Sequence, residues 1–251
     1  MTPVRPPGRA VRSWRRVPPL SLAVLGLALA GQLGWHSRLP PPAARAEALP
    51  PAPAAATLRV LSFGDPVFGA KALMLWLLGF DQQPGVSLPY RSLDYARVRD
   101  WLALALALDP RSQYPLLAAS RLYGEVADPA RSRVMLEFVY EAFDEDPSRR
   151  WPWLAHAVFV AQHRLHDPAR ALRYARRLAD GPAADIPGWA RQLQIFVLEN
   201  IGELEAAQIL LGGLLDSGQL TDPHERAFLA RRLDDIAARR GDVEKSTELS
   251  D

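Results

Sequence analysis

Apolar residues recur with helical spacing from Leu93 to Gly218. Four runs there place apolar residues three and four positions apart, the period of helices that bury one face. The equivalent sixth positions of their opening segments lie 34, 39 and 36 residues apart, at Val98, Ser132, Ala171 and Ala207. A repeat of this length predicts an all-α domain of antiparallel helix pairs stacked as an α-solenoid, and a helical bundle with accidental periodicity is the alternative.

Helix boundaries are marked in register with this period. The four runs end at Asp109-Pro110, Asp146-Pro147, Gly181-Pro182 and Ser217-Gly218. Proline fits a first helical turn, so partner helices are predicted to begin at Tyr114-Pro115, Trp151-Pro152 and Ile186-Pro187. The aspartates that precede Pro129, Pro168 and Pro223 are predicted to cap the helices that follow them.

This block, about half of the chain, resembles the tetratricopeptide-repeat (TPR) family. Ala171 and Ala207 fall where that family keeps a small residue in its second helix, and Ala105 falls at a second such place. Pro110 and Pro147 fall where it keeps a closing proline, whereas its first-helix motif of Trp, Leu-Gly and Tyr is absent. The resemblance implies a curved helical scaffold that binds another polypeptide.

The N-terminal region predicts a membrane segment. Residues 20–36 are apolar and span roughly 24 Å as a helix, close to the thickness of a bilayer core once residues 17–19 are added. Residues 1–19 form a basic tail with five arginines and no acid, which predicts a cytoplasmic N-terminus and a periplasmic helical domain on a single-pass inner-membrane protein. One alternative is a signal peptide that is cleaved near Ala30, so that the helical domain is secreted to the periplasm. The others are a buried helix of a soluble protein, and the reverse topology with the helical domain in the cytoplasm.

The remaining segments complete the expected organisation. Residues 37–56 read as a Pro/Ala-rich, poorly packed linker, and residues 57–240 as the helical repeat domain. Within it, residues 57–63 form a short strand or lead into a helix that runs from Asp65 to Phe80. That helix is apolar nearly all round, which predicts burial, and is too short for a second span. A capping helix is expected up to Arg240, followed by a disordered tail at residues 241–251.

Composition narrows the function classes. The absence of cysteine among 251 residues excludes disulfides, thiolate zinc sites and thiol catalysis. Removing the five N-terminal arginines from the net charge of +2 leaves −3 for the rest, so nucleic-acid binding is not expected.

Two groups of residues are candidate sites. Arg149, Arg150, Trp151 and Trp153 would present guanidinium groups and indole faces to a peptide carboxylate or an anionic head group, or would simply form a helix start with a tryptophan in the core. His156, His163 and His166 share one helical stretch but have no acidic partner at ligand spacing, so His163 is instead a candidate partner-binding residue.

No catalytic motif, cofactor motif or metal motif is recognised. The sequence therefore predicts a non-enzymatic scaffold, without cofactor or metal, that binds or helps to assemble a protein partner in the cell envelope. The alternative is a helical enzyme or metal-binding domain that uses His156, His163 and His166. The oligomeric state stays open.

Overall fold

A computed structural model describes residues 18–38, 46–218, 220 and 222–248, and the chain is mostly α-helical, with 74% of it in helices. The chain divides into two units, residues 1–45 and 46–251. This confirms the predicted all-α class with its separate N-terminal helix.

The first unit contains α1, Pro19–Arg38. None of its side chains is buried, and it is long and apolar enough to cross a membrane. A signal sequence has the same length and composition, so α1 is either a membrane anchor or a signal sequence.

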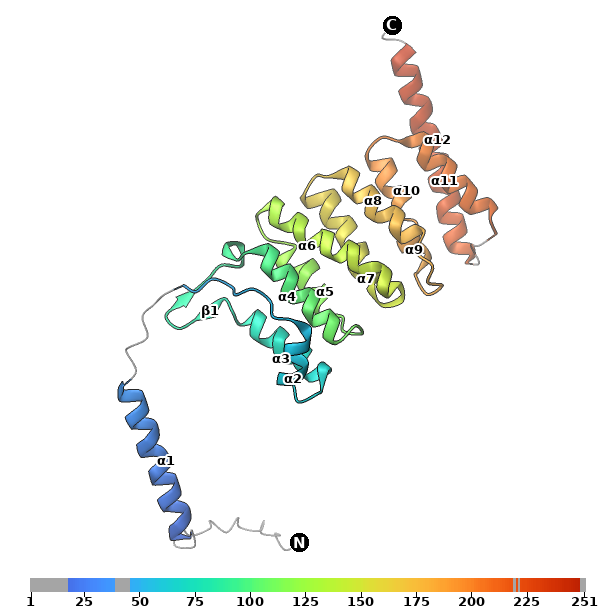
Figure 1. Ribbon diagram of the computed structural model, residues 1–251. Helices are drawn as coiled ribbons and strands as arrows, with labels where there is room; N and C mark the ends of the chain where they lie inside the picture. The colour runs from blue at the N-terminus through green and yellow to red at the C-terminus, as the bar shows by residue number, and fades with distance from the viewer. Residues whose placement is uncertain (1–17, 39–45, 219, 221, 249–251) are drawn as a thin grey trace, which may run out of the picture. The chain divides into compact units, whose positions relative to one another are not determined.

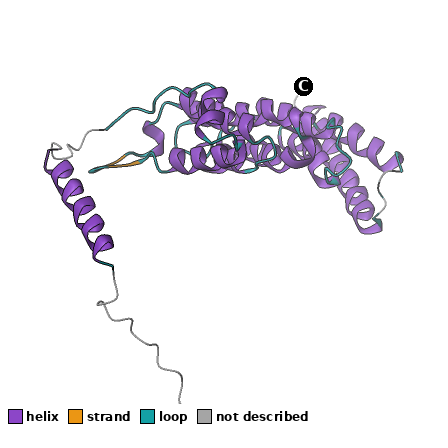
Figure 2. Cartoon of the chain, turned by 60° about the horizontal axis from the view of Figure 1, so that its bottom comes forward, coloured by secondary structure: helices purple, strands orange, loops and turns teal. Residues whose placement is uncertain are grey.

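The second unit is a row of helix pairs in chain order (Figures 1 and 2). The first pair is α3 (Pro66–Leu78) with α4 (Tyr95–Leu108), preceded by α2 (Ala55–Leu61). Next come α5 (Tyr114–Leu117) with its π-helical extension η3 (Ala118–Tyr123) against α6 (Pro129–Ala142), and α7 (Pro147–Phe159) with η5 (Val160–Arg164) against α8 (Pro168–Ala179). The last elements are α9 (Gly188–Arg191), α10 (Leu193–Asn200), α11 (Leu204–Asp216) and α12 (Pro223–Glu248).

Packing follows the sequence order. Each helix contacts its chain neighbours, and α4 also packs on α6 as α8 packs on α10. One apolar core extends from Leu49 to Val197, and a second joins α10, α11 and α12 around Leu211 and Ile236. The four equivalent positions of the predicted period are all fully buried, at Val98, Ser132, Ala171 and Ala207.

The predicted helix starts and stops are largely confirmed. Asp128, Asp167 and Asp222 each accept a hydrogen bond from a backbone N–H in the first turn that follows. The helices α4, α8 and α11 end within two residues of the predicted breakers. Four of the capping aspartates also pair with the arginine three residues on, in the pairs Asp94–Arg97, Asp128–Arg131, Asp146–Arg149 and Asp167–Arg170.

Some boundaries differ from the prediction. Helix α7 begins at Pro147 and not at Trp151, because Asp146 caps it. The dipeptide Asp146-Pro147, which was predicted to end one helix, therefore also begins the next. Residues 55–61 form a helix, so the strand alternative is wrong, and a short hairpin of β1 (Gln82–Gln83) and β2 (Val86–Ser87) occupies the expected loop. The 3-10 turns η2 (Tyr90–Ser92) and η4 (Phe143–Glu145) complete the elements.

Three expectations about packing are corrected. The linker is docked after residue 45, since Leu49 is buried and Trp101 Nε1 donates to the Pro50 carbonyl at 2.8 Å; residues 39–45 lie outside the described residues. The expected tail is helical as far as Glu248, because Gly241 does not interrupt α12. Helix α3 buries one face only, and Phe68 and Leu75 on its other side are exposed.

Asp167 offers a test of the ion pairs that accompany the helix caps. Desolvation raises the pKa of its carboxyl, but the Arg170 N–H, the Arg170 guanidinium and Arg133 outweigh it, so the net pKa lies below the usual 3.8. Asp167→Asn keeps a side-chain oxygen that can cap α8 but removes the carboxylate charge that pairs with Arg170 and Arg133, so it should lower the free energy of unfolding by about 0.5–1 kcal/mol at neutral pH. Because the folded-state pKa is depressed, this difference should be complete above pH 3.8 and vanish as the pH falls through the folded-state value.

Urea unfolding of the full chain in detergent, followed by circular dichroism at several pH values, measures the difference. Asp216→Asn, at the exposed C-terminal end of α11, is the matched control and should change stability by less than about 0.5 kcal/mol. An Asp167→Asn deficit that persisted unchanged at low pH would contradict the ion-pair role of Asp167.

Candidate functional site

Aromatic side chains lie in the first two turns of helices in three consecutive helix pairs. Tyr114 begins α5, Trp151 and Trp153 lie in the second turn of α7, and Trp189 lies at the start of α9. We call these four residues the aromatic row. Tyr114 and Trp189 are 48% and 49% exposed, and the two others are half-buried, so the row is open to solvent along its length.

Contacts within the row connect one helix pair to the next. The Trp151 and Trp189 rings meet edge to face, with centroids 5.4 Å apart and an interplanar angle of 76°. Trp153 Nε1 donates a hydrogen bond of 2.6 Å to Oε1 of Gln113, the residue next to Tyr114. These contacts restrain the Trp151, Trp153 and Trp189 rings, so less side-chain entropy would be lost if a partner bound them.

Local sequence explains how α7 presents its tryptophans. Asp146 caps the helix and Pro147 occupies its first position, which sets the helical register. In that register Leu154 and Val158 point into the core, while Trp151 and Trp153 lie at its border. Both rings are half-buried against the core, which confirms that they pack, and their part in binding stays a prediction.

Arg149 adds a cation next to the row. Its guanidinium is 45% exposed and pairs with Asp146 at 2.6 Å in the first turn of α7. An exposed pair of this kind stabilises the fold by less than about 1 kcal/mol, so the guanidinium can exchange its carboxylate for one on a partner.

Arg150 has a different environment from its neighbour. Its side chain is 1% exposed and donates to the Ala142 carbonyl at 2.5 Å, to Glu145 at 2.8 Å and to the Pro110 carbonyl at 3.1 Å. It thus ties the ends of α4 and α6 to the start of α7. Arg150 is therefore a packing residue and not a surface residue, although the sequence grouped it with Arg149.

The histidines do not converge. His156 Nε2 lies 2.9 Å from Glu125 Oε1, His163 is exposed and stacks on Phe159, and His166 adopts a positive φ of 49° where η5 ends. No group of three His, Asp or Glu side chains in the described part of the chain is arranged to hold a metal ion. His163 lies on the surface, as the sequence predicted for a candidate partner contact, and no contact of the structure tests that role.

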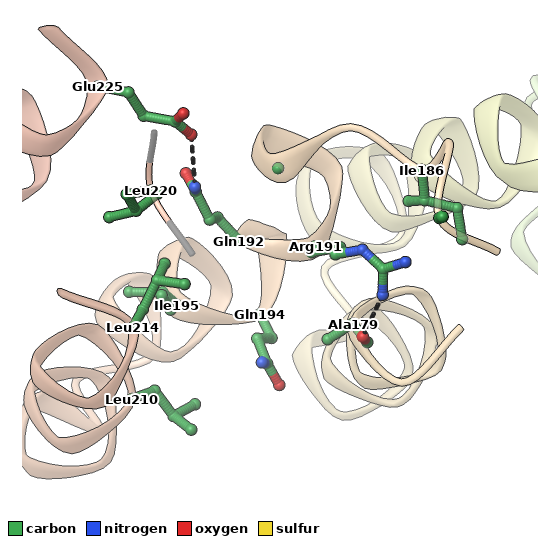
Figure 3. Close-up of a pocket in the computed structure, with 12 residues that line it drawn as sticks. Ala179, Ile186, Arg191, Gln192, Gln194, Ile195, Leu210, Leu214, Leu220 and Glu225 are labelled. Atoms are coloured by element: carbon green, nitrogen blue, oxygen red, sulfur yellow. Dashed lines mark hydrogen bonds between the residues drawn. The ribbon is translucent and has the colours of Figure 1, made fainter. Parts of the chain in front are cut away.

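A cavity of about 880 Å³ lies where α9 and α10 face α11 and the start of α12 (Figure 3). Arg191 donates to the carbonyls of Ala179, Gly181 and Ala183 at 2.5–2.8 Å, and Gln192 Nε2 donates to Glu225 at 2.7 Å. Those polar groups hold neighbouring segments together and do not converge on a reaction centre. Sequence reasoning missed this cavity because its walls come from helices separated by loops without any recognisable motif.

An ion-pair seam joins α6 and α8, and it was also missed. Glu137 accepts from Arg170 at 2.7 Å, from Tyr174 at 3.2 Å and from Arg173. Burial raises the pKa of Tyr174 to about 12, although the hydrogen bond from Arg170 opposes the rise. The phenol therefore stays protonated as a donor, and the seam holds two successive helix pairs in register.

The chain was compared with known proteins by family, sequence and structure. No family model, no curated protein and no solved structure matches it significantly. The all-α fold with sequential helix pairs is established from the structure itself, and no family is assigned.

A comparison of Arg150 with Arg149 tests whether the first is a packing residue and the second a surface residue. Arg150→Met should lower the free energy of unfolding by about 2–4 kcal/mol, because it leaves the Ala142 and Pro110 carbonyls without their donor in a buried site. Arg149→Met, one residue away on the surface, should cost less than about 1 kcal/mol. Urea unfolding of both variants compares them directly, and equal losses would contradict the assignment.

Proposed function

We propose that the protein is a non-enzymatic scaffold, tethered to a membrane by α1, whose TPR-like helical domain binds a protein partner in the cell envelope. The observation that carries this proposal is the aromatic row, which presents four aromatic rings from three successive helix pairs. The repeat interpretation is supported by the complete burial of equivalent positions in four helices.

The chemistry of the row favours a polypeptide as partner. Tryptophan, tyrosine and arginine are enriched among the residues that dominate binding at protein interfaces. The row contains the first two, and Arg149 in the first turn of α7, two residues before Trp151, supplies the third. Its extent across several helix pairs suits a helix or an extended segment laid across the stack, and Arg149 suits an acidic residue on that segment.

The membrane tether follows from α1 and the charges before it. We propose that the arginine-bearing N-terminus stays in the cytoplasm and the helical domain lies in the periplasm, with α1 as a permanent inner-membrane anchor. The competing form is a periplasmic domain released after cleavage near Ala30. Apolar character continues past Ala30 to Trp35, which supports the anchor.

Photocrosslinking in native membranes tests the aromatic row. With a benzophenone amino acid at Trp189, the full chain should give one discrete adduct, whose yield falls about tenfold or more when Trp151→Ala and Tyr114→Ala remove neighbouring anchors. The same photoreactive residue at Arg176, exposed on α8, is the matched control and should give no such adduct. Equal adducts from both positions, or none from Trp189, would refute a partner site at the row.

A topology measurement tests the tether. A reporter that is active only outside the cytoplasm, fused after Asp251, should be active, and the mature chain should retain residues 1–30 by mass spectrometry. A shortened chain that begins after Ala30 would replace the anchor with a signal peptide. Activity of a cytoplasm-only reporter at the same position would reverse the topology.

A further inference from the structure

The turn between α2 and α3 exposes an unusual density of apolar side chains. Seven of the fourteen exposed large apolar side chains in the described part of residues 46–242 lie between Val60 and Trp76. Five of them surround the turn itself, and we call these the apolar tip: Val60, Leu61, Phe63, Val67 and Phe68. Phe63 at its apex is 98% exposed.

The tip is held in place by its own backbone. The axes of α2 and α3 meet at 103°, and the turn passes through Phe63 and Gly64 with φ values of 55° and 81°. Asp65 Oδ1 caps α3 by accepting from the N–H groups of Val67 and Phe68, both at 3.0 Å. Phenylalanine disfavours a positive φ, so the structure fixes an aromatic ring in water in a conformation that is itself unfavourable.

Behind the tip, α3 is fixed to the domain. Leu73, Met74 and Leu77 on its other face are buried in the core that α3 shares with α4. Because the other face of α3 is packed in the core, α3 cannot rotate to bury Val67 and Phe68, and these side chains of the tip stay exposed.

A cavity of about 250 Å³ opens between the two helices next to the tip. Its walls are apolar apart from Ser62 and include Leu58, Leu61, Phe68, Trp76 and Trp101. A narrow apolar cavity of this kind fits a segment of hydrocarbon chain better than a polar ligand.

Charges and indoles around the tip indicate a lipid surface. Arg59 and Lys71 flank it and are exposed, and Asp65 is the one acid in residues 55–78, where its carboxylate is bonded to the α3 amides. At the base of the tip, the Trp76 ring contacts Trp101 at 4.7 Å between centroids. An apolar apex with an aromatic base and basic flanks is the arrangement of segments that enter one leaflet of an anionic bilayer.

The short connection between α1 and the second unit keeps the apolar tip close to a membrane that contains α1. Residues 39–45 lie between α1 and the second unit, and a chain of seven residues spans at most about 25 Å. A domain tethered in this way stays near the bilayer that α1 enters.

We propose that the apolar tip inserts into the leaflet of the membrane that faces the helical domain, giving the domain a second membrane contact besides α1. This inference rests on the anchored state proposed above. Two contacts restrain the domain's rotation, so the aromatic row would be presented at a defined orientation to the bilayer.

The absence of cysteine makes a direct test available. The full-length Phe63→Cys variant, labelled with the fluorophore NBD, is reconstituted into phosphatidylethanolamine–phosphatidylglycerol vesicles with or without brominated acyl chains. Its emission should shift to the blue and fall to roughly half or less with the brominated lipids, as expected for a probe below the head groups. Ile209→Cys is the matched control, since Ile209 is an apolar residue on α11 that is 66% exposed, and its label should be unaffected.

The outcomes separate this inference from the tether. A Phe63→Cys label that stays red-emitting and insensitive to brominated lipid, in a chain that resists alkaline extraction, refutes insertion and leaves the anchor intact. A blue-shifted label that brominated lipid does not quench also refutes it, because a second copy of the chain would then cover the tip. Quenching of the tip in a chain that alkali extracts would refute the α1 anchor, and with it the proposal of a second contact, because the tip would then be a membrane contact without α1.

Discussion

Burial between helices that are neighbours in the sequence is the constraint on which this structure depends. Small or fully enclosed residues at Val98, Ser132, Ala171 and Ala207 let successive helices approach closely. Since each helix packs mainly on the next, the domain grows in one direction, and every added pair places its first turn beside the previous one. The aromatic row depends on this geometry, because its members lie in the first two turns of successive helices and Trp151 reaches Trp189 of the next pair.

Polar side chains keep this stack in register. Arg150 bridges the ends of α4 and α6 and the start of α7, while Glu137 collects three donors across α6 and α8. Arg232 and Arg239 of α12 pair with the buried Glu199 of α10 in the same way. A charge buried at a helix junction is costly when its partner is displaced, so these contacts disfavour slippage between pairs.

Much of this fold was predictable because its signals are local. Helix period, Asp-Pro caps and breaker dipeptides act over a few residues, and they located α4, α6, α8 and α11 closely. Asp146-Pro147 shows the limit, since the same dipeptide ends one helix and begins the next, and the apolar-Pro rule therefore placed the start of α7 too late. For the candidate site, the sequence singled out the Arg149–Trp153 string, but only tertiary packing separates a buried Arg150 from an exposed Arg149. Trp189 was missed because only the stack brings it to Trp151, 38 positions earlier, and Tyr114 was missed because only the stack places the neighbouring Gln113 against Trp153.

The behaviour of α3 shows why apolar composition alone does not predict burial. A helix that is apolar all round needs neighbours on every side, and at the first position of a one-dimensional stack only one side is occupied. Helix α12, at the other end of the stack, also has a face without a neighbouring helix, but that face is charged and is therefore compatible with water. Helix α3 has no such charged face between Val67 and Leu78 apart from Lys71. The two ends of the stack therefore follow opposite rules, and the apolar end is also the one joined in sequence to α1. That asymmetry fits a domain that meets lipid at its first helices and solvent at its last.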